Sequence, residues 1–267
     1  MAIIIESEVS ESIRQFTSSW EQIVEDMPGV DLIDSSGLAV RWADSPFTFW
    51  NAIFLSEPVA DARKLDFRIS TAVTYMKGKA HAGMIWICEE YLNGDASEKL
   101  PEILKKEKLE PAVSTTGMAG EIFPLRAPAH PSLQIERVSD ESMLRKNADI
   151  NCEAYGLPRE WGLNALTPKF WTQEAYSYLG YENGRAVCTA SVLVNEGCLF
   201  LALVATRPDA RKKGYGEAVV RHALRRAHEA TGLTRTILHA TEAGGPIYRR
   251  LGYHDTARIV AYSRSEE

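Results

Sequence analysis

The sequence lacks the features that mark membrane, secreted or metal-binding proteins. No stretch reaches the about 18 apolar residues that a spanning helix needs. The apolar run that Glu6 ends is too short for a signal peptide, and it has no basic segment. The cysteines, at positions 88, 152, 188 and 198, form no C-x-x-C pair and no zinc-finger spacing with histidine. These absences predict a cytoplasmic protein with no membrane partner, metal site or disulfide framework.

Excess positive charge is also missing. Thirty lysines and arginines stand against 36 acidic residues, for a net charge of −6. This balance argues against a nucleic-acid or anionic-membrane surface spread over the whole molecule. The 267 residues have room for two domains of roughly 130 residues each, although one large domain is also possible.

Proline clusters mark the clearest boundary. Pro124, Pro128 and Pro131 fall within eight residues and rule out a continuous helix or central strand there. We therefore predict a first domain at 1–125, a linker at 126–132 and a second domain at 133–267.

The second half has the pattern of a strand, a helix and a strand. Residues 199–205 are nearly all apolar, as in a strand covered on both faces, and residues 216–232 carry one apolar stripe at helical spacing. Residues 235–240 then predict a parallel strand. Upstream, Asn183-Gly184 between two strand-like runs predicts a hairpin.

A basic turn with two glycines joins the apolar strand to this helix. A helix starting at Gly214 would point unpaired amide groups at an anion over the turn, and Gly214 and Gly216 would let it approach the backbone. Val219 stands where a dinucleotide-binding fingerprint needs its third glycine, and Tyr215 replaces the lysine of a Walker loop. Both of those interpretations fail.

The remaining pattern is R-x-x-G-x-G from Arg211 to Gly216, after a strand ending in Val204-Ala205-Thr206-Arg207-Pro208. A later segment carries Tyr248 and then Leu251-Gly252-Tyr253. With these motifs in order, residues 133–263 resemble the GNAT superfamily of N-acetyltransferases. The resemblance implies an α/β fold with a mixed sheet. Thr241 and Glu242 stand where many members have an asparagine, which puts that cofactor contact in doubt.

The first half shows a similar order of elements without the phosphate motif. Strand-like runs at 47–55 and 83–88 alternate with helix-like runs at 61–76 and 98–108. No R-x-x-G-x-G occurs before residue 211. This half resembles the degenerate half of tandem GNAT proteins, so we expect two GNAT-like domains, the first serving as scaffold or as one wall of the substrate cleft.

The resemblance implies acetyl-CoA as cosubstrate. Its pantetheine would lie along the strand end, and its pyrophosphate would sit on the glycine turn with Arg211 as the first charged contact. Lys212 and Lys213 would reach solvent or the 3′-phosphate. The implied cofactor-binding residues are Val204, Ala205, Thr206, Arg211, Lys212, Lys213, Gly214, Tyr215 and Gly216.

Tyr248 matches the position at which the family often carries a tyrosine near the cofactor sulfur. The implied role is that of a general acid to the leaving thiolate. Glu196, His239 and Glu242 each lie where a general base could stand. Nothing in the sequence selects one of them, and we assign none.

The expected function is an acetyl-CoA-dependent N-acetyltransferase. It would transfer acetyl to a primary amine of a small molecule or peptide, directly within a ternary complex, because no activated nucleophile motif is present. An alternative is a regulatory module that binds acyl-CoA without turnover. A third option is a nucleic-acid-binding protein that uses its basic helix. The acceptor and the oligomeric state stay open.

Overall fold

The computed structural model describes residues 6–127, 130, 132–163 and 165–265. The chain divides into two compact units, and each contains segments distant in sequence. The first comprises Met1–Met118, Ala240–Gly245 and Asp255–Glu267, and the second comprises Ala119–His239 and Pro246–His254. The predicted linker and domain limits stay a prediction.

The first unit combines strands with helices on both faces. β1, β2 and β3 pair as an antiparallel meander, β3 pairs parallel with β4, and β4 pairs antiparallel with β11, the last strand of the chain. Its elements are α1 (Glu8–Val24), β1 (Asp31–Ser35), β2 (Leu38–Trp42), η1 (Thr48–Trp50), β3 (Asn51–Leu55), α2 (Ala62–Lys77), β4 (Met84–Cys88), η2 (Glu89–Tyr91), α3 (Gly94–Lys106), β5 (Leu109–Glu121) and β11 (His254–Arg264).

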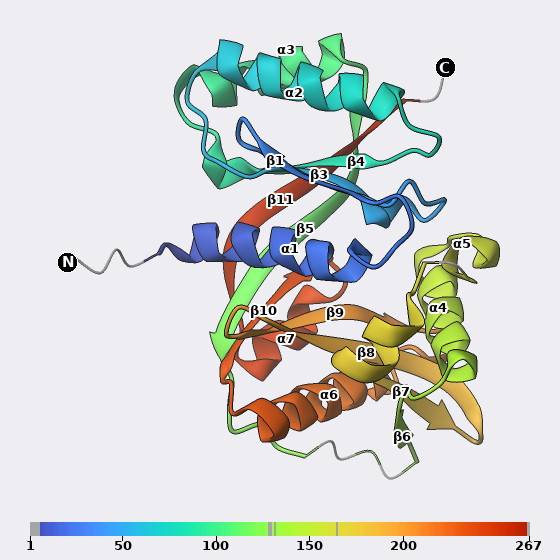
Figure 1. Ribbon diagram of the computed structural model, residues 1–267. Coiled ribbons are helices and arrows are strands. Elements are labelled where there is room, and N and C mark those ends of the chain that lie inside the picture. The colour runs from blue at the N-terminus through green and yellow to red at the C-terminus, as the bar shows by residue number, and fades with distance from the viewer. Residues whose placement is uncertain (1–5, 128–129, 131, 164, 266–267) are drawn as a thin grey trace. The chain divides into compact units, whose positions relative to one another are not determined.

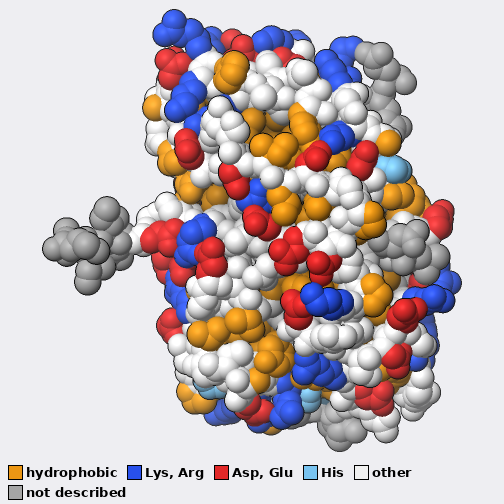
Figure 2. Space-filling model, in the orientation of Figure 1, with side chains coloured by type: hydrophobic (Ala, Val, Ile, Leu, Met, Phe, Trp, Pro, Cys, Tyr) orange, Lys and Arg blue, Asp and Glu red, His pale blue; other side chains and the backbone are white. Residues whose placement is uncertain are grey.

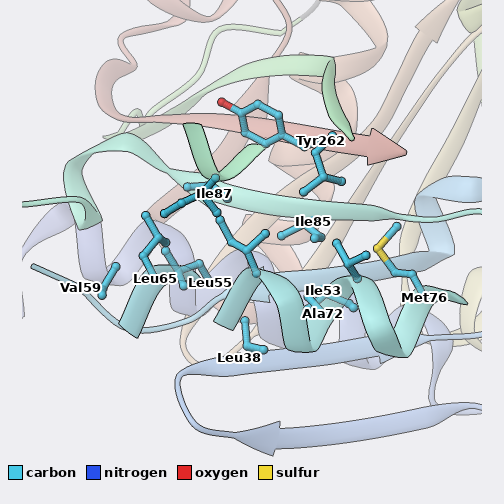
Figure 3. Packing of buried hydrophobic residues seen from close by; sticks show 14 of the residues in the cluster. Leu38, Ile53, Leu55, Val59, Leu65, Ala72, Met76, Ile85, Ile87 and Tyr262 are labelled. Atoms are coloured by element: carbon cyan, nitrogen blue, oxygen red, sulfur yellow. The ribbon is translucent and has the colours of Figure 1, made fainter. Parts of the chain in front are cut away.

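Alternation along the strands divides the core of this unit into two layers. Ile53 of β3 and Ile85 of β4 belong to a cluster that α2 covers, as Figure 3 shows. The residues that directly follow them, Phe54 and Trp86, turn to the other face and pack around Phe16 of α1, with ring centroids 4.9 and 5.0 Å away. In Figure 1, α2 and α3 accordingly lie on one face of these strands and α1 on the other.

The second unit is built around a long hairpin. β6, β7, β8 and β9 pair antiparallel in sequence order, and β9 pairs parallel with β10. Its elements are β6 (Gln134–Arg137), α4 (Glu141–Tyr155), α5 (Arg159–Leu163), the π-helix η3 (Phe170–Glu174), β7 (Tyr176–Glu182), β8 (Arg185–Asn195), β9 (Cys198–Thr206), η4 (Pro208–Ala210), α6 (Tyr215–Thr231), β10 (Arg235–Ala240) and α7 (Gly245–Leu251).

The central elements of this unit follow the sequence predictions. Asn183 and Gly184 turn the β7–β8 hairpin with φ of 50° and 77°, as the predicted tight turn requires. α6 buries Val219, Val220 and Leu224 of its apolar stripe, and it contacts β7, β8 and β9. The predicted hairpin and strand–helix–strand order are confirmed.

Two predictions for the first unit need correction. Residues 48–50 form the short helix η1, and the strand begins only at Asn51. The Trp50 side chain is only 1% exposed, so its apolar character reflects burial in a turn rather than in a strand. The helix expected at 98–108 runs from Gly94 to Lys106. Pro101 lies inside it, where its fixed φ and missing N–H group weaken the sequence pattern of a helix.

The order of elements in the first half repeats in the second. The series β1, β2, β3, α2, β4, α3, β5 corresponds to β7, β8, β9, α6, β10, α7, β11. Each series contains a parallel pair around its long helix, β3–β4 and β9–β10. The predicted α/β class with a mixed sheet is confirmed. Over the part of the chain that the structure describes, no helix has both the length and the apolar character needed to cross a membrane.

Candidate functional site

Strand β9 carries a bulge just before its C-terminal end. Against β8, Ala202 pairs with Ser191 and Ala205 pairs with Thr189, so two residues of β9 stand opposite one residue of β8. Leu203, in the bulge, has φ of 48°, a left-handed conformation that is costly for a branched residue. Such strain persists where surrounding structure imposes it, often at ligand sites.

On its other edge, β9 stops pairing with β10 close to the bulge. Its parallel ladder with β10 runs from Leu199–Thr236 to Leu201–Leu238 and ends there. Beyond this point, Val204 and Thr206 are partly exposed, whereas Ala205 is 5% exposed. The backbone of residues 202–206 is therefore placed to pair with an extended ligand by strand addition.

The turn after β9 ends in a left-handed glycine that starts α6. Gly214 has φ of 82° and occupies the N-cap position. The helix therefore begins at Tyr215, one residue after the predicted start at Gly214. Among the described residues, no side chain caps this terminus. The first amide groups of α6 therefore have no side-chain acceptor within that part of the chain, and the positive end of the helix dipole favours an anion there.

Side chains brace this turn from two directions. The Arg211 guanidinium donates to the carbonyl oxygens of Thr206 at 3.2 Å and of Ala154 at 3.0 Å. Lys213 forms an ion pair with Glu182 at 3.1 Å. The Tyr215 hydroxyl donates to the same carboxylate, and this bond is the main cause that lowers the pKa of Glu182.

Lys212 differs from its two basic neighbours. It is exposed, has φ of 62°, and makes no ion pair within the described residues. Of the predicted basic contacts, Arg211 bonds to backbone carbonyls, Lys213 pairs with the Glu182 carboxylate, and Lys212 keeps its ammonium group available.

A histidine from the predicted linker lies on the turn, and it was not among the predicted site residues. His130 Nε2 is 2.7 Å from the Lys213 carbonyl oxygen, and its ring packs edge-on against Tyr215 with centroids 4.6 Å apart. Ser132 Oγ lies 3.1 Å from His130 Nδ1. A lone histidine in a proline-rich stretch has no motif, so only the tertiary structure could assign this contact.

In the first unit, the corresponding helix is α2, and carboxylates cap its N-terminus. Asp61 accepts a bond from the Lys64 amide at 2.9 Å, and Asp95 accepts one from the Ala62 amide at 3.0 Å. Two carboxylates thus occupy the positions from which α2 could bind a phosphate. This contrast with α6 gives a structural reason for the missing glycine motif in the first half.

Tyr248 lies on α7 and is 7% exposed. Its ring packs edge-on against Tyr253 with centroids 5.9 Å apart. Burial raises the pKa of Tyr248 well above its usual range, so the phenol keeps its proton at neutral pH. The structure therefore provides a protonated hydroxyl in the second unit, although burial also makes it a weaker acid.

The three candidate bases lie on different segments of the chain. Glu196 is in the β8–β9 turn with φ of 43°, and His239 is on β10. Glu242 follows β10, in a turn closed by hydrogen bonds from the Gly244 and Gly245 amides to the Thr241 carbonyl. Nothing in these positions selects one of them.

The cysteines do not form an activated nucleophile. All four are buried and have free thiols. Burial raises the pKa of Cys88 and of Cys188 to about 12 and also raises the pKa of Cys152. Their thiolate forms are therefore scarce at neutral pH.

Comparison with family models finds a match within the second unit. Residues 145–253 match the family model described as acetyltransferase (GNAT) family. No curated protein sequence matches the chain.

Solved structures share the fold over nearly the whole chain. A GCN5-related N-acetyltransferase from Kribbella flavida is 20% identical, with a TM-score of 0.71 and coverage of 96% of each chain. One from Sphaerobacter thermophilus is 15% identical, with a TM-score of 0.60, covering 97% of this chain and 91% of its own. These likenesses concern the fold, and they confirm the predicted GNAT-like architecture. The sequence match in the second unit adds that residues 145–253 of this chain match the acetyltransferase (GNAT) family.

Proposed function

We propose that this protein is an acetyl-CoA-dependent N-acetyltransferase that acts on a primary amine of a small molecule or peptide. The observation that carries the proposal is the N-terminus of α6 at Gly214, which no described side chain caps and which ends the turn that follows the bulged end of β9. The same chain fills the N-terminus of α2 with two carboxylates. The difference supports one phosphate site, on α6, and a scaffolding role for the first unit.

In this proposal the cofactor follows β9 into the turn. Pantetheine amides pair with the backbone of Val204, Ala205 and Thr206, on the edge that β10 leaves open. Amide groups at the Leu203 bulge polarise the thioester oxygen, which favours attack by the amine. The pyrophosphate lies on the amides from Gly214 to Gly216, with the free ammonium of Lys212 beside it.

Transfer proceeds directly from the thioester to the amine. The raised pKa values of the buried cysteines disfavour a covalent acyl-enzyme on sulfur. Tyr248, which is protonated at neutral pH, supplies the proton that the departing thiolate takes up. The group that deprotonates the amine is left unassigned.

The first experiment measures CoA and acetyl-CoA affinity by calorimetry for the wild type and for Gly214→Glu. The added carboxylate enters the phosphate position, and we expect at least a hundredfold loss of affinity. Gly232→Glu is the matched control, because Gly232 ends the same helix with φ of 74° and has nothing within 4 Å of an added Cβ. Equal affinities for the wild type and Gly214→Glu would disprove the site.

A second experiment separates an enzyme from a binding module. Thiol release from acetyl-CoA is followed over a panel of primary amines that includes polyamines, amino acids and peptides. Amine-dependent release supports the transferase. Tight CoA binding with no release above the rate of spontaneous hydrolysis, for any amine, would favour the alternative acyl-CoA-binding module.

A further inference from the structure

A cavity in the first unit lies apart from the elements used above. It has a volume of about 160 Å³ and opens between α2 and the strands β1 to β3. Its floor is apolar: Leu38 and Ile53 come from the strands, and Ala72 comes from α2. Figure 3 shows these three side chains in the apolar layer between α2 and the strands.

Large apolar side chains border the mouth of this cavity in contact with solvent. Phe67 is 63% exposed and Ile33 is 43% exposed, and both line the cavity. In Figure 2, hydrophobic side chains gather on this face below α2 and over β1. Exposed apolar groups around a concave surface are typical of ligand sites rather than of ordinary surface.

The cavity wall contains a buried arginine whose three nitrogen atoms each make a hydrogen bond. Arg68, 1% exposed, donates to the Ser36 carbonyl at 2.8 Å, to the Glu57 carbonyl at 2.9 Å and to the Glu57 carboxylate at 2.9 Å. The Tyr75 hydroxyl donates to Asp31, which also accepts from Lys79. Among the described lining residues, no cation remains to bind an anion, and the carboxylates nearby repel one.

Size then limits the ligand. An apolar cavity of about 150 Å³ in a well-studied protein stays dry and takes up benzene. We propose that this cavity binds a small, uncharged molecule with one aromatic or aliphatic ring, whose single polar group meets the hydroxyls of Ser35, Ser36 or Thr71 at the rim. Acetyl-CoA is excluded by its charge, so this site is independent of the proposed transferase site.

The test compares benzyl alcohol with benzoate, which have the same ring and similar size but differ in charge. Binding to the full-length protein is measured by calorimetry and by the shifts of methyl signals from Leu38 and Ile53. Benzyl alcohol is expected to bind saturably, and benzoate at least tenfold more weakly. Equal affinity for both, or no saturable binding of benzyl alcohol, would overturn the proposal.

Two threonines on α2 provide a matched pair of variants. Thr71 lines the cavity and Thr74 does not. Both are exposed and donate Oγ to the carbonyl four residues back at 2.8 Å. Thr71→Phe closes the mouth and should reduce benzyl alcohol affinity at least tenfold, whereas Thr74→Phe should leave it unchanged. Equal effects of the two variants would contradict the assignment.

A further variant and a mass measurement complete the test. Phe67→Ala removes an exposed wall, so its effect does not depend on refolding of the core, and it should lower benzyl alcohol affinity at least threefold. Retained affinity would contradict the site. If the wild type is a dimer by sedimentation and Thr71→Phe makes it a monomer, a second copy covers this face and the proposal is wrong.

Discussion

Single residues in unusual backbone conformations define the candidate site. Gly214 at the start of α6 was expected to let an anion approach the backbone, and the structure adds a positive φ, which glycine adopts without strain. The left-handed conformation of Leu203 in β9 was not expected, because no sequence feature of an apolar strand residue indicates it. Its strain is imposed by the pairing of β8 with β9.

The first residue-scale prediction concerns Tyr248. Tyr248→Phe should lower kcat by about tenfold to a hundredfold and change CoA affinity by less than about twofold. Because burial raises the pKa of Tyr248, kcat should show no decline from its ionisation between neutral pH and about pH 10. Steady-state kinetics across pH, together with calorimetry, measures both quantities.

Tyr253→Phe is the control for this substitution. Tyr253 is buried to a similar degree, at 4% exposure, and burial also raises its pKa. A loss of kcat confined to Tyr248→Phe identifies the acid. Equal losses in the two variants would indicate a packing role for both rings.

The second residue-scale prediction concerns the β1–β2 turn. An added Cβ at Gly37 would lie 1.9 Å from Arg68 Nη2, and the guanidinium cannot move without losing its bonds to Ser36 and Glu57. Gly37→Ala should therefore lower the free energy of unfolding by about 3 kcal/mol. Gly29→Ala, with φ of 71° and open space around its Cβ, should cost only about 1 kcal/mol. Urea denaturation measures both, and equal costs would show that Arg68 relaxes freely.

At the scale of elements, the two long helices are alike in place but differ at their first turn. α2 begins with bonds to Asp61 and Asp95, and α6 begins with an uncapped glycine. The sequence predicted that the two helices differ, because the R-x-x-G-x-G motif is missing from the first half. It did not predict that Asp95, more than 30 residues later in the chain, would bond to the start of α2.

An element-scale prediction concerns the contact between β7 and the start of α6. Bonds from Tyr215 first and Lys213 second lower the pKa of Glu182 below its ordinary 4.5. A carboxylate with a lowered folded-state pKa stabilises the protein above pH 4.5, and this contribution is lost as the pH falls through the lowered value. Glu182→Gln should therefore reduce the melting temperature at pH 7, and the difference from wild type should vanish in strong acid.

Glu136→Gln on β6 controls for the loss of one negative charge, since Glu136 is an exposed residue of a neighbouring strand. Thermal melts from pH 3 to pH 8 give the comparison. A pH-independent difference for Glu182→Gln would show that the carboxylate charge is not what stabilises the contact.

At the scale of the molecule, the last strand of the chain completes the first unit. β11 pairs with β4, and its Ile259 and Ala261 are 1% and 0% exposed. A fragment of residues 133–267, the predicted second domain, would carry β11 without β4 and expose this apolar edge. We expect the fragment to aggregate, whereas the full chain does not.

Size-exclusion chromatography and amide NMR dispersion measure this outcome. A second fragment, residues 133–253, lacks β11 and controls for the exposed strand itself; it should aggregate less than 133–267. A monomeric 133–267 fragment with well-dispersed signals would show that the predicted domain is independent of the first unit.

The sequence by itself determined the local features: the β7–β8 hairpin, the apolar strand β9, the amphipathic helix α6 and the basic glycine turn, together with the family resemblance. Each depends on neighbouring residues, through turn conformation or hydrophobic period. Only the tertiary structure decided the Leu203 bulge, His130 against Tyr215, the filled terminus of α2, and β11 beside β4. These contacts join residues far apart in the chain, and their energies come from register and packing that no local pattern encodes.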